Sequence, residues 1–443
     1  MRSLIPRRWR RDESLPPFSG WRIVGLCAVL SLMTAPGQTT GVSVFIDPMI
    51  EGLGLSRSEV SSAYLIGTLT GAFALPTIGR LLDRRGPRFA ATVVGSLFGA
   101  VLVGMAGVVG LITLTLGFTG IRMLGQGGLS VVASTTPARW FNRRRGLAIG
   151  ITTAIGSAGQ SIVPLATTAV ILAVGWRLTW ATFAVLVWVI VLSIARWGLI
   201  DRPEDVGQRM DGEVPSQPVG NPGTNPGGAE DQHVAQDTGW YEASFTKAEA
   251  MRTPIFWAVT MSLATAGLIT TALTFHQISI LGEQGLSPIE AAVNFVPQTI
   301  TALTLTLVVG SLIDRVRQRF LLVTMMALLA ASMVGINVVE PGLLAIIYGI
   351  VLGASQGMLR SVSGASYPKL FGVAHAGEIR GFAQSVSIAA SAFGPLALSF
   401  GFDLTASYRQ ILLVLLILPA ASTVFALLAP EVRRPPRSAH GDA

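Results

Sequence analysis

The pattern of apolar and polar positions divides the chain into long apolar stretches separated by short polar segments. A helix of about 20 apolar residues crosses the roughly 30 Å hydrocarbon core of a bilayer while satisfying its own backbone. Twelve stretches have about this length: 22–46, 60–79, 89–110, 112–136, 146–173, 178–199, 255–281, 290–312, 319–339, 342–365, 378–402 and 409–429. The pattern therefore predicts an all-α membrane protein with twelve transmembrane helices.

The second half of the chain repeats the first at an offset of 231 residues. The sequence Gly-Leu-Ser-x-x-Glu that ends at Glu59 returns ending at Glu290, and Gly-Arg-Leu-Leu-Asp-Arg at 79–84 returns as Gly-Ser-Leu-Ile-Asp-Arg at 310–315. Such duplication in a membrane protein indicates two pseudo-symmetric six-helix bundles with a site between them. The expected parts are an N-terminal segment, a first bundle, a linker, a second bundle and a tail, at 1–21, 22–200, 201–252, 253–430 and 431–443.

Basic residues give the orientation, because Lys and Arg in short loops mark the cytoplasmic side. With the N-terminus inside, only Arg57, Arg177 and Arg409 lie on the outer side. We therefore expect a multi-pass protein of the cytoplasmic (inner) membrane with both termini in the cytoplasm. Hydrophobic residues make up 51% of the chain and charged residues 13%. In this context the net charge of +8 indicates contact with anionic lipid head groups and not with nucleic acid.

The chain offers little for catalysis or for holding a metal or cofactor. Cys27 is its single cysteine, His276 is the one histidine within a predicted span, and no Walker sequence is present. The Pro- and Gly-rich segment 215–228 cannot bury a core, so we expect a tether there and a short surface helix at 245–252. We expect no enzyme, no metal and no cofactor, and the absence of a Walker sequence means that any transport cycle must draw on an ion or substrate gradient.

Two sets of six spans, each with a Gly-x-x-x-Asp-Arg element between its second and third helices, resemble the major facilitator superfamily. The elements lie at 79–84 and 310–315, and the resemblance covers essentially the whole chain. It implies the twelve-helix fold of that superfamily and transport by movement of one bundle against the other.

A cytoplasmic latch is a further implication of this resemblance. Asp83 and Arg84 would engage the start of the eleventh span near Arg380, while Asp314 and Arg315 would make the equivalent contact at the start of the fifth. An aspartate at a helix end suits both a cation and the positive N-terminus of a facing helix. The alternative is ordinary positive-inside charge without a latch.

Five further sequences resemble the monocarboxylate transporter and oxalate/formate antiporter branch of the superfamily. They are Gly-Trp-Arg at 20–22 and 175–177, Trp-Phe-Asn-Arg-Arg-Arg-Gly-Leu-Ala at 140–148, Arg-Pro-Glu-Asp at 202–205 and Tyr-Pro-Lys-Leu-Phe-Gly at 367–372. This resemblance implies a small organic anion, monocarboxylate-like, as the substrate. The eighth span lacks the arginine and the first span the lysine found in the branch, so a larger or less acidic substrate held by amides is also open.

Two arginines lie within predicted spans, Arg122 in the fourth and Arg360 in the tenth. A cation at mid-helix costs about 3 kcal/mol, and apart from Asp47 at the outer end of the first span no carboxylate lies deep in a span. Because buried charges need partners, we infer that an anionic substrate pairs with one or both arginines. In the alternative, Arg122 bonds helix carbonyls and Arg360 extends to the cytoplasmic interface.

Uncharged polar residues within the spans complete the predicted substrate site. They are Gln38, Tyr64, Gln126, Asn294, Gln298 and Gln356. Asn294 and Gln298 are four residues apart and therefore share one helical face. Each of these side chains could instead form a hydrogen bond between neighbouring helices.

Asp47 and His276 lie at almost corresponding places on the first and seventh spans. They are the one titratable pair near the outer half of the pathway, and histidine titrates near neutral pH. We expect this pair to carry a coupled proton or to form an external gate. The alternative is an interfacial aspartate and an unrelated, packed histidine.

We therefore expect a monomeric secondary transporter that moves a small organic anion by alternating access. A proton or a counter-anion is its expected coupling partner, and the lipid bilayer is its surroundings. Two other functions stay open: an exporter of a drug-like or secondary metabolite, and a sensor built on a transporter fold.

Overall fold

The computed structural model describes residues 18–212, 245–313, 315–372 and 375–430, and the regular elements within them are helices. The first half contains α1 (Gly20–Leu32), η1 (Ala35–Gly37), α2 (Thr39–Ser43), α3 (Ile46–Leu53), α4 (Arg57–Ala106), α5 (Leu111–Ile121), η2 (Arg122–Leu129), α6 (Ser130–Thr135), η3 (Thr136–Arg139), α7 (Arg145–Ser193), η4 (Ile194–Gly198), η5 (Pro203–Val206) and η6 (Met210–Gly212). The second half contains α8 (Lys247–Met251), α9 (Pro254–Phe275), α10 (Gln277–Glu283), α11 (Pro288–Val293), α12 (Phe295–Leu312), α13 (Gln318–Gly335), η7 (Ile336–Val338), α14 (Leu343–Phe371), α15 (Ala376–Thr405), α16 (Tyr408–Leu415) and α17 (Ile417–Leu428). The predicted tail, the Pro- and Gly-rich tether and residues 1–17 lie outside the described residues.

Nine helical stretches of the described chain are long and apolar enough to cross a membrane. Two of them, 57–106 and 145–198, are 50 and 54 residues long and break at Gly86 and Gly175, whose φ angles of 83° and 81° favour glycine. A methyl group added to Gly128 would touch both Ile78 and Val94, so α4 doubles back on itself. These two stretches thus supply two crossings each, and α5, η2 and α6 together supply another. The predicted twelve-helix fold is confirmed.

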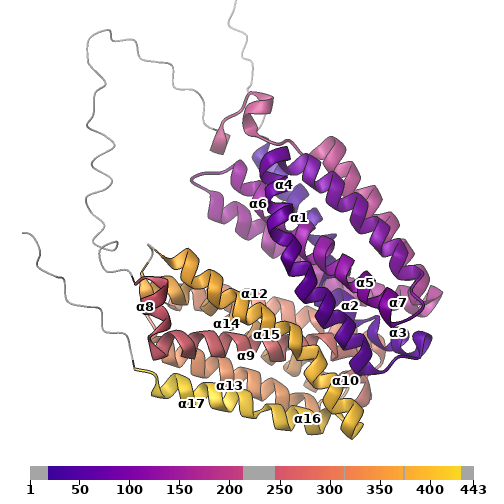
Figure 1. Cartoon of the computed structure of the whole chain (residues 1–443), viewed down its shortest axis with the longest axis vertical. Coiled ribbons are helices and arrows are strands. Elements are labelled where there is room, and N and C mark those ends of the chain that lie inside the picture. Colours follow the sequence, from indigo (N-terminus) through magenta and orange to yellow (C-terminus); the bar gives the residue numbers. More distant parts are fainter. Residues whose placement is uncertain (1–17, 213–244, 314, 373–374, 431–443) are drawn as a thin grey trace, which may run out of the picture.

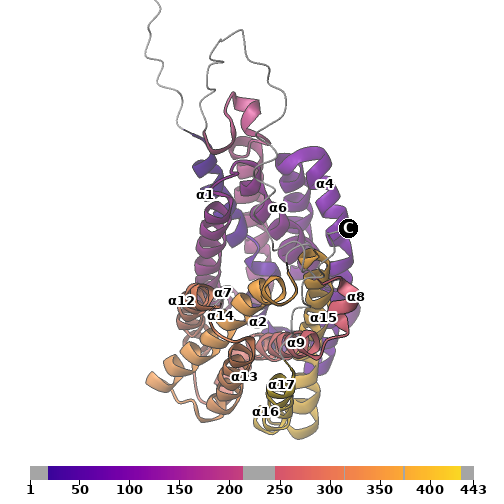
Figure 2. The ribbon, with the colours of Figure 1, turned by 90° about the vertical axis from the view of Figure 1, so that its left-hand side faces the viewer.

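Two hydrophobic cores correspond to the two halves of the chain. One core extends from Ile23 to Leu199 and also takes in Phe275 of the second half, and the other extends from Ala250 to Ala429. The halves meet near α3, α10 and α16 and diverge toward α6 and α8 (Figure 1). Figure 2 shows that α7 lies beside α12 and α4 beside α15, and these pairs join the halves. We call the diverging end, near the arginine-rich turn that follows α6, the basic end.

The sequence repeat becomes a structural repeat at the opposite end. Ser56 and Ser287 each form a capping box with the glutamate three residues later. The glycines two residues before them, Gly54 and Gly285, both have positive φ, 65° and 86°. The break at η1 has no counterpart in the second half, since α9 runs unbroken through the corresponding positions.

Both ends of the linker dock on the bundles. The Asp211 carboxylate accepts the backbone N–H groups of Arg143 and Asn142 at 2.8 and 2.9 Å, beside the start of α7. These bonds, that from Arg143 first, hold the pKa of Asp211 below the ordinary aspartate value. At the other end, Phe245 donates its N–H to Phe371 O at 2.9 Å and packs edge-on against its ring. α8 then falls within the range predicted for a short surface helix.

The first span is interrupted where it crosses the fourth. Pro36 has no N–H group with which to continue a helix. At the next residue, Gly37, an added methyl group would overlap the carbonyl oxygen of Ile121 and lie 2.8 Å from the nitrogen of Gln126. By contrast, nothing lies within 4 Å of the position that a Cβ would take at Gly25 in α1. Close backbone packing therefore requires glycine at position 37.

We expect Gly37→Ala to destabilise the protein by about 1–3 kcal/mol, because the extra methyl group must push the backbone of the fourth span away. Gly25→Ala is the matched control, and it should be neutral or slightly stabilising because alanine favours a helix. Thermal unfolding of both purified variants in one detergent measures the difference. Equal melting temperatures for the two variants would contradict the close approach.

Candidate functional site

Arg122 lies at the junction of the first, second and fourth spans, with 5% of its surface exposed. Its Nε donates to Thr68 Oγ1 and its Nη1 to Gly37 O, both at 3.1 Å, and its guanidinium lies 4.7 Å from the centre of the Tyr64 ring. No carboxylate among the described residues pairs with it. Arg122 begins η2, a π-helical turn, and such turns are frequent at functional sites.

Polar side chains hold the break in the first span. Gln38 donates to Thr34 Oγ1 at 3.1 Å and to Ser130 Oγ at 3.4 Å. Gln160 donates to Ser31 O at 2.8 Å and to Thr34 Oγ1 at 3.0 Å. Unpaired backbone carbonyls are costly in a membrane, and here Gln160 donates to Ser31 O and Arg122 to Gly37 O.

Arg360 opens into a cavity of about 290 Å³ between α9, α14 and α15. Within the described chain no hydrogen bond or ion pair holds its guanidinium. The other polar side chains of the cavity carry hydroxyl or amide groups: Thr270, Thr271, Ser363, Gln384, Ser387 and Ser391. The buried hydroxyl of Ser387 has no hydrogen-bond partner. The cavity thus combines an unpaired cation with an unpaired hydroxyl group.

The other predicted amides occupy two kinds of position. Asn294 and Gln298 are buried, and Gln298 donates to Asn294 Oδ1 and to Gln277 Oε1, both at 2.8 Å. These amides bond one another and the backbone carbonyls of Ala345 and Ala291, so they are already paired within the second half. Gln126 and Gln356 are half-buried, and their side chains form no hydrogen bond within the described residues, so both can bind a ligand.

A polar cluster joins the two halves at the end opposite the basic end. Arg57 Nη1 lies 2.7 Å from Asp47 Oδ1. Ser279 Oγ donates to Asp47 at 2.7 Å and accepts from Arg57 at 3.1 Å. The Arg57 guanidinium also lies 4.8 and 5.5 Å from the ring centres of Phe402 and Tyr408. Ser279 and both rings belong to the second half. The Asp47–Arg57 ion pair of the first half therefore contacts the second half directly.

Two further contacts cross between the halves next to this cluster. The hydroxyl groups of Ser61 and Ser399 lie 2.6 Å apart. Tyr64 is fully buried, its ring centre is 4.6 Å from that of Phe275, and its hydroxyl is 2.7 Å from Thr39 Oγ1. Tyr64 therefore faces Arg122 on one side and the second half on the other.

His276 is fully buried, and no hydrogen bond links it to Asp47. Its Nε2 lies 3.1 Å from Pro395 O and 3.0 Å from Ser399 Oγ, and its Nδ1 lies 3.2 Å from Tyr408 Oη. A neutral imidazole with its proton on Nε2 donates to the carbonyl and accepts from the tyrosine, which satisfies both ring nitrogens. The histidine thus supports two residues that contact the first half, Ser399 and Tyr408.

Among the described residues, the predicted contact of Asp83 and Arg84 with the start of α15 near Arg380 is not formed in this conformation. Asp83 pairs with Arg139 of its own half at 3.3 Å. Three other latch residues are exposed and form no ion pair in the part of the chain that is described: Arg84, Arg315 and Arg380. Asp314 lies outside the described residues.

Several residues that close the opposite end are not predicted by the sequence: Arg57, Ser61, Ser279, Ser399 and Tyr408. The sequence repeat could have indicated one of them, because Ser279 lies one residue after the position that corresponds to Asp47. The bonds themselves join residues hundreds of positions apart, which local patterns do not report.

No group of three or more His, Cys, Asp or Glu residues in the described segments could hold a metal ion.

Relatives of known sequence match part of the chain. It is 30% identical over 140 residues to the probable L-galactonate transporter of Escherichia coli (strain K12), covering 31% of this chain and 30% of that protein. It is 29% identical over 132 residues to the oxalate:formate antiporter of Oxalobacter formigenes, covering 29% and 30%. The matched stretches thus span less than a third of either relative.

A solved structure extends the likeness to the whole fold. A bacterial homologue of the human lysosomal transporter Spinster, in an inward-facing and unoccupied conformation, superposes with a TM-score of 0.67 at 16% identity, covering 93% of this chain and 97% of that chain. At this identity the likeness concerns the fold alone.

The family model described as Major Facilitator Superfamily matches residues 28–395, which include most of both bundles. This match agrees with the duplicated twelve-helix architecture and with the Gly-x-x-x-Asp-Arg element of the first half. The chain is therefore a multi-pass membrane protein that belongs to the Major Facilitator Superfamily.

Proposed function

We propose that this protein is a monomeric secondary transporter that moves a small organic anion across the cytoplasmic membrane by alternating access, coupled to protons. Both termini are assigned to the cytoplasm, so the basic end faces inward and the closed end faces outward. The observation that carries the substrate class is Arg360, a cation on a transmembrane helix with no partner among the described residues. Arg360 is exposed toward the cavity, so its counter-ion is assigned to a substrate that enters there.

The cavity around Arg360 favours a carboxylate that also carries hydroxyl groups. A guanidinium binds a carboxylate through two parallel hydrogen bonds. Ser363, Gln384 and Ser387 line the same cavity and can bond hydroxyl groups of the ligand. The names of the two relatives, which refer to galactonate and to oxalate and formate, support an organic anion.

Arg122 is proposed as a second anchor, on the first half. Its Nε and Nη1 are committed to Thr68 and Gly37, and no hydrogen bond in the described chain uses its Nη2. That group, with the unpaired amides of Gln126 and Gln356, is available to a substrate as the bundles close around it. Asn294 and Gln298 are proposed to contact the substrate in a conformation that opens their cluster.

The Asp47 cluster is proposed as the outer gate and as the point of proton coupling. Protonation of Asp47 would remove the negative partner of Arg57 and so weaken the contact between the halves. His276 is proposed to act in the gate by supporting Ser399 and Tyr408. In the outward-facing conformation, Asp83 would then leave Arg139 and engage the start of α15.

An exporter of a drug-like metabolite is the second candidate. Apolar side chains in the same cavity favour it: Leu263, Leu359 and Ile388. A sensor with a transporter fold is the third, and it would bind a ligand without moving it.

Uptake into proteoliposomes tests the substrate class. Wild-type protein is offered 2-hydroxy acids, sugar acids and dicarboxylates, with and without an inward proton gradient. We expect Arg360→Gln to reduce uptake about 10- to 100-fold, because hydrogen bonds to charged groups contribute about 1.5–3 kcal/mol. Arg409→Gln removes an exposed charge outside the cavity and is the control.

The result distinguishes all three candidates. If no carboxylate moves, or if Arg360→Gln and Arg409→Gln transport equally well, the organic-anion proposal is wrong. Movement of a drug-like amphiphile alone would favour the exporter. Ligand binding to purified protein without accumulation in the vesicles would favour the sensor.

Asp47→Asn tests proton coupling, because asparagine resembles a permanently protonated aspartate. We expect uptake by this variant to lose its stimulation by an inward proton gradient, while exchange of external for internal substrate continues. Glu51→Gln, at an exposed carboxylate on the same helix, is the control. Stimulation of Asp47→Asn equal to that of the control would exclude Asp47 as the coupling residue.

Arg57→Gln should open the outer gate more often. On a Cys27→Ala background, the buried interface residue Ser61 is replaced by cysteine, and its labelling by an impermeant maleimide added outside is timed. Loss of the Arg57 bonds should speed labelling about tenfold or more. Arg177→Gln is the control, since Arg177 bonds carbonyl groups of its own half. Equal labelling rates in the two variants would rule out the gate.

A further inference from the structure

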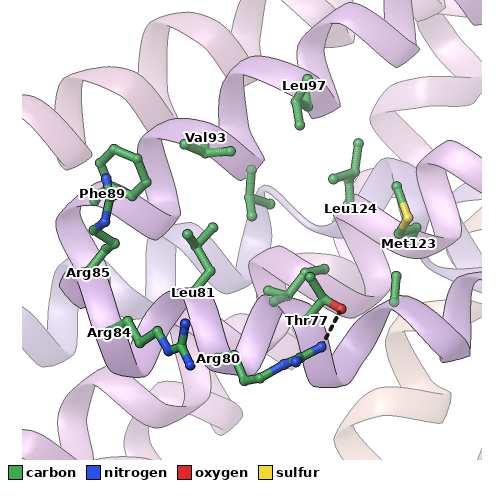
Figure 3. Close-up of a pocket in the computed structure, with 13 residues that line it drawn as sticks. Thr77, Arg80, Leu81, Arg84, Arg85, Phe89, Val93, Leu97, Met123 and Leu124 are labelled. Carbon is green, nitrogen blue, oxygen red and sulfur yellow. Dashed lines mark hydrogen bonds between the residues drawn. The ribbon is translucent and has the colours of Figure 1, made fainter.

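A groove runs along the first half between the two legs of α4 and over η2 (Figure 3). Its volume is about 770 Å³, within the range of small-molecule sites. Apolar side chains form most of its wall: Leu81, Phe89, Val93, Leu97, Met123 and Leu124. Leu97 and Phe89 are 52% and 40% exposed. In a bilayer the exposed side chains of Leu97 and Phe89 would face lipid, which opens the groove to acyl chains.

Three exposed arginines lie at the basic end of this groove, on the last turn and a half of the first leg of α4 (Figure 3). Arg80 is bonded only within its own helix, 3.2 Å from Thr77 Oγ1. Arg85 lies over the Phe89 ring, 5.0 Å from its centre. Arg84 forms no hydrogen bond or ion pair with any described residue. Positive charge therefore lies at one end of the apolar groove, where the second span is predicted to end at the membrane surface.

Two other arginines close to the end of the first leg of α4 form hydrogen bonds within the protein. Arg88 Nη2 donates to Arg196 O at 2.7 Å. Arg139 Nη2 donates to Leu82 O at 3.0 Å and lies 3.3 Å from Asp83. Neither lines the groove. These two hold the turn together, whereas the three groove arginines are left to bind an anion from outside the chain.

We propose that the groove is a binding site for an anionic phospholipid. One acyl chain lies along the apolar wall between the legs of α4, and the phosphate is bound by Arg80, Arg84 and Arg85. Guanidinium groups match phosphate oxygens in geometry as well as in charge. A zwitterionic lipid would bring its own cation among three arginines, so the site favours a lipid of net negative charge.

A bound lipid would also join parts that belong to different spans. Its chain contacts both legs of α4 and Met123 of η2, the turn that begins with Arg122. The lipid would enter the groove laterally from the membrane, whichever substrate is transported.

Native mass spectrometry of the full-length protein with added phosphatidylglycerol or phosphatidylcholine tests this site. We expect one tightly bound phosphatidylglycerol on the wild type and roughly 20-fold weaker binding by Arg84→Gln/Arg85→Gln. Arg144→Gln/Arg145→Gln removes the same charge from an exposed turn outside the groove and should bind as the wild type does. Ala74→Phe fills the groove, keeps every arginine and should also weaken binding.

Three results would overturn the proposal. Equal losses in both double variants would indicate general surface charge. Unchanged binding by Ala74→Phe would mean that no chain occupies the groove, and full competition by inorganic phosphate would identify a phosphate site in place of a lipid site. If Arg84→Gln/Arg85→Gln does not fold, Arg80→Gln replaces it, with an expected loss of about fivefold.

Discussion

The hydrocarbon core of a bilayer offers no hydrogen-bond partner, and the rest of this structure depends on that constraint. The break in the first span frees the Gly37 carbonyl, and Arg122 Nη1 donates to it at 3.1 Å while Arg122 Nε donates to Thr68 of the second span. The buried arginine therefore links the break in the first span to the second and fourth spans.

The two halves share a frame and differ in their polar interiors. Matching capping boxes begin the second and eighth spans, with left-handed glycines just before them. By contrast, the position that corresponds to Arg122 in the second half is Gly353, and the position that corresponds to Arg360 in the first half is Leu129. A ligand held between the bundles therefore meets chemically different walls, although the bundles have the same frame.

Local and periodic features of this fold were predictable from the sequence. Span lengths follow from apolar stretches, the outer turns from the Gly-Leu-Ser-x-x-Glu repeat, and the buried position of Arg122 from its place within a span. The contacts between the halves were not predictable, because Arg57 and Ser279 are 222 residues apart and neither lies in a pattern that identifies the other. Asp83 pairs with Arg139 of its own half, and no pattern in the sequence identifies that partner.

Arg57 has one more consequence for the proposed cycle. While the outer end is closed, its charge is cancelled by Asp47 at 2.7 Å and covered by two aromatic rings. In the proposed cycle, loss of the Asp47 contact on opening would leave an uncompensated cation at the mouth of the pathway. The electric field of this cation would raise the local concentration of anions, and the effect would weaken as ionic strength rises. Arg57 would then attract an anionic substrate to the entrance only while the entrance is open, although the same residue closes the entrance in the other conformation.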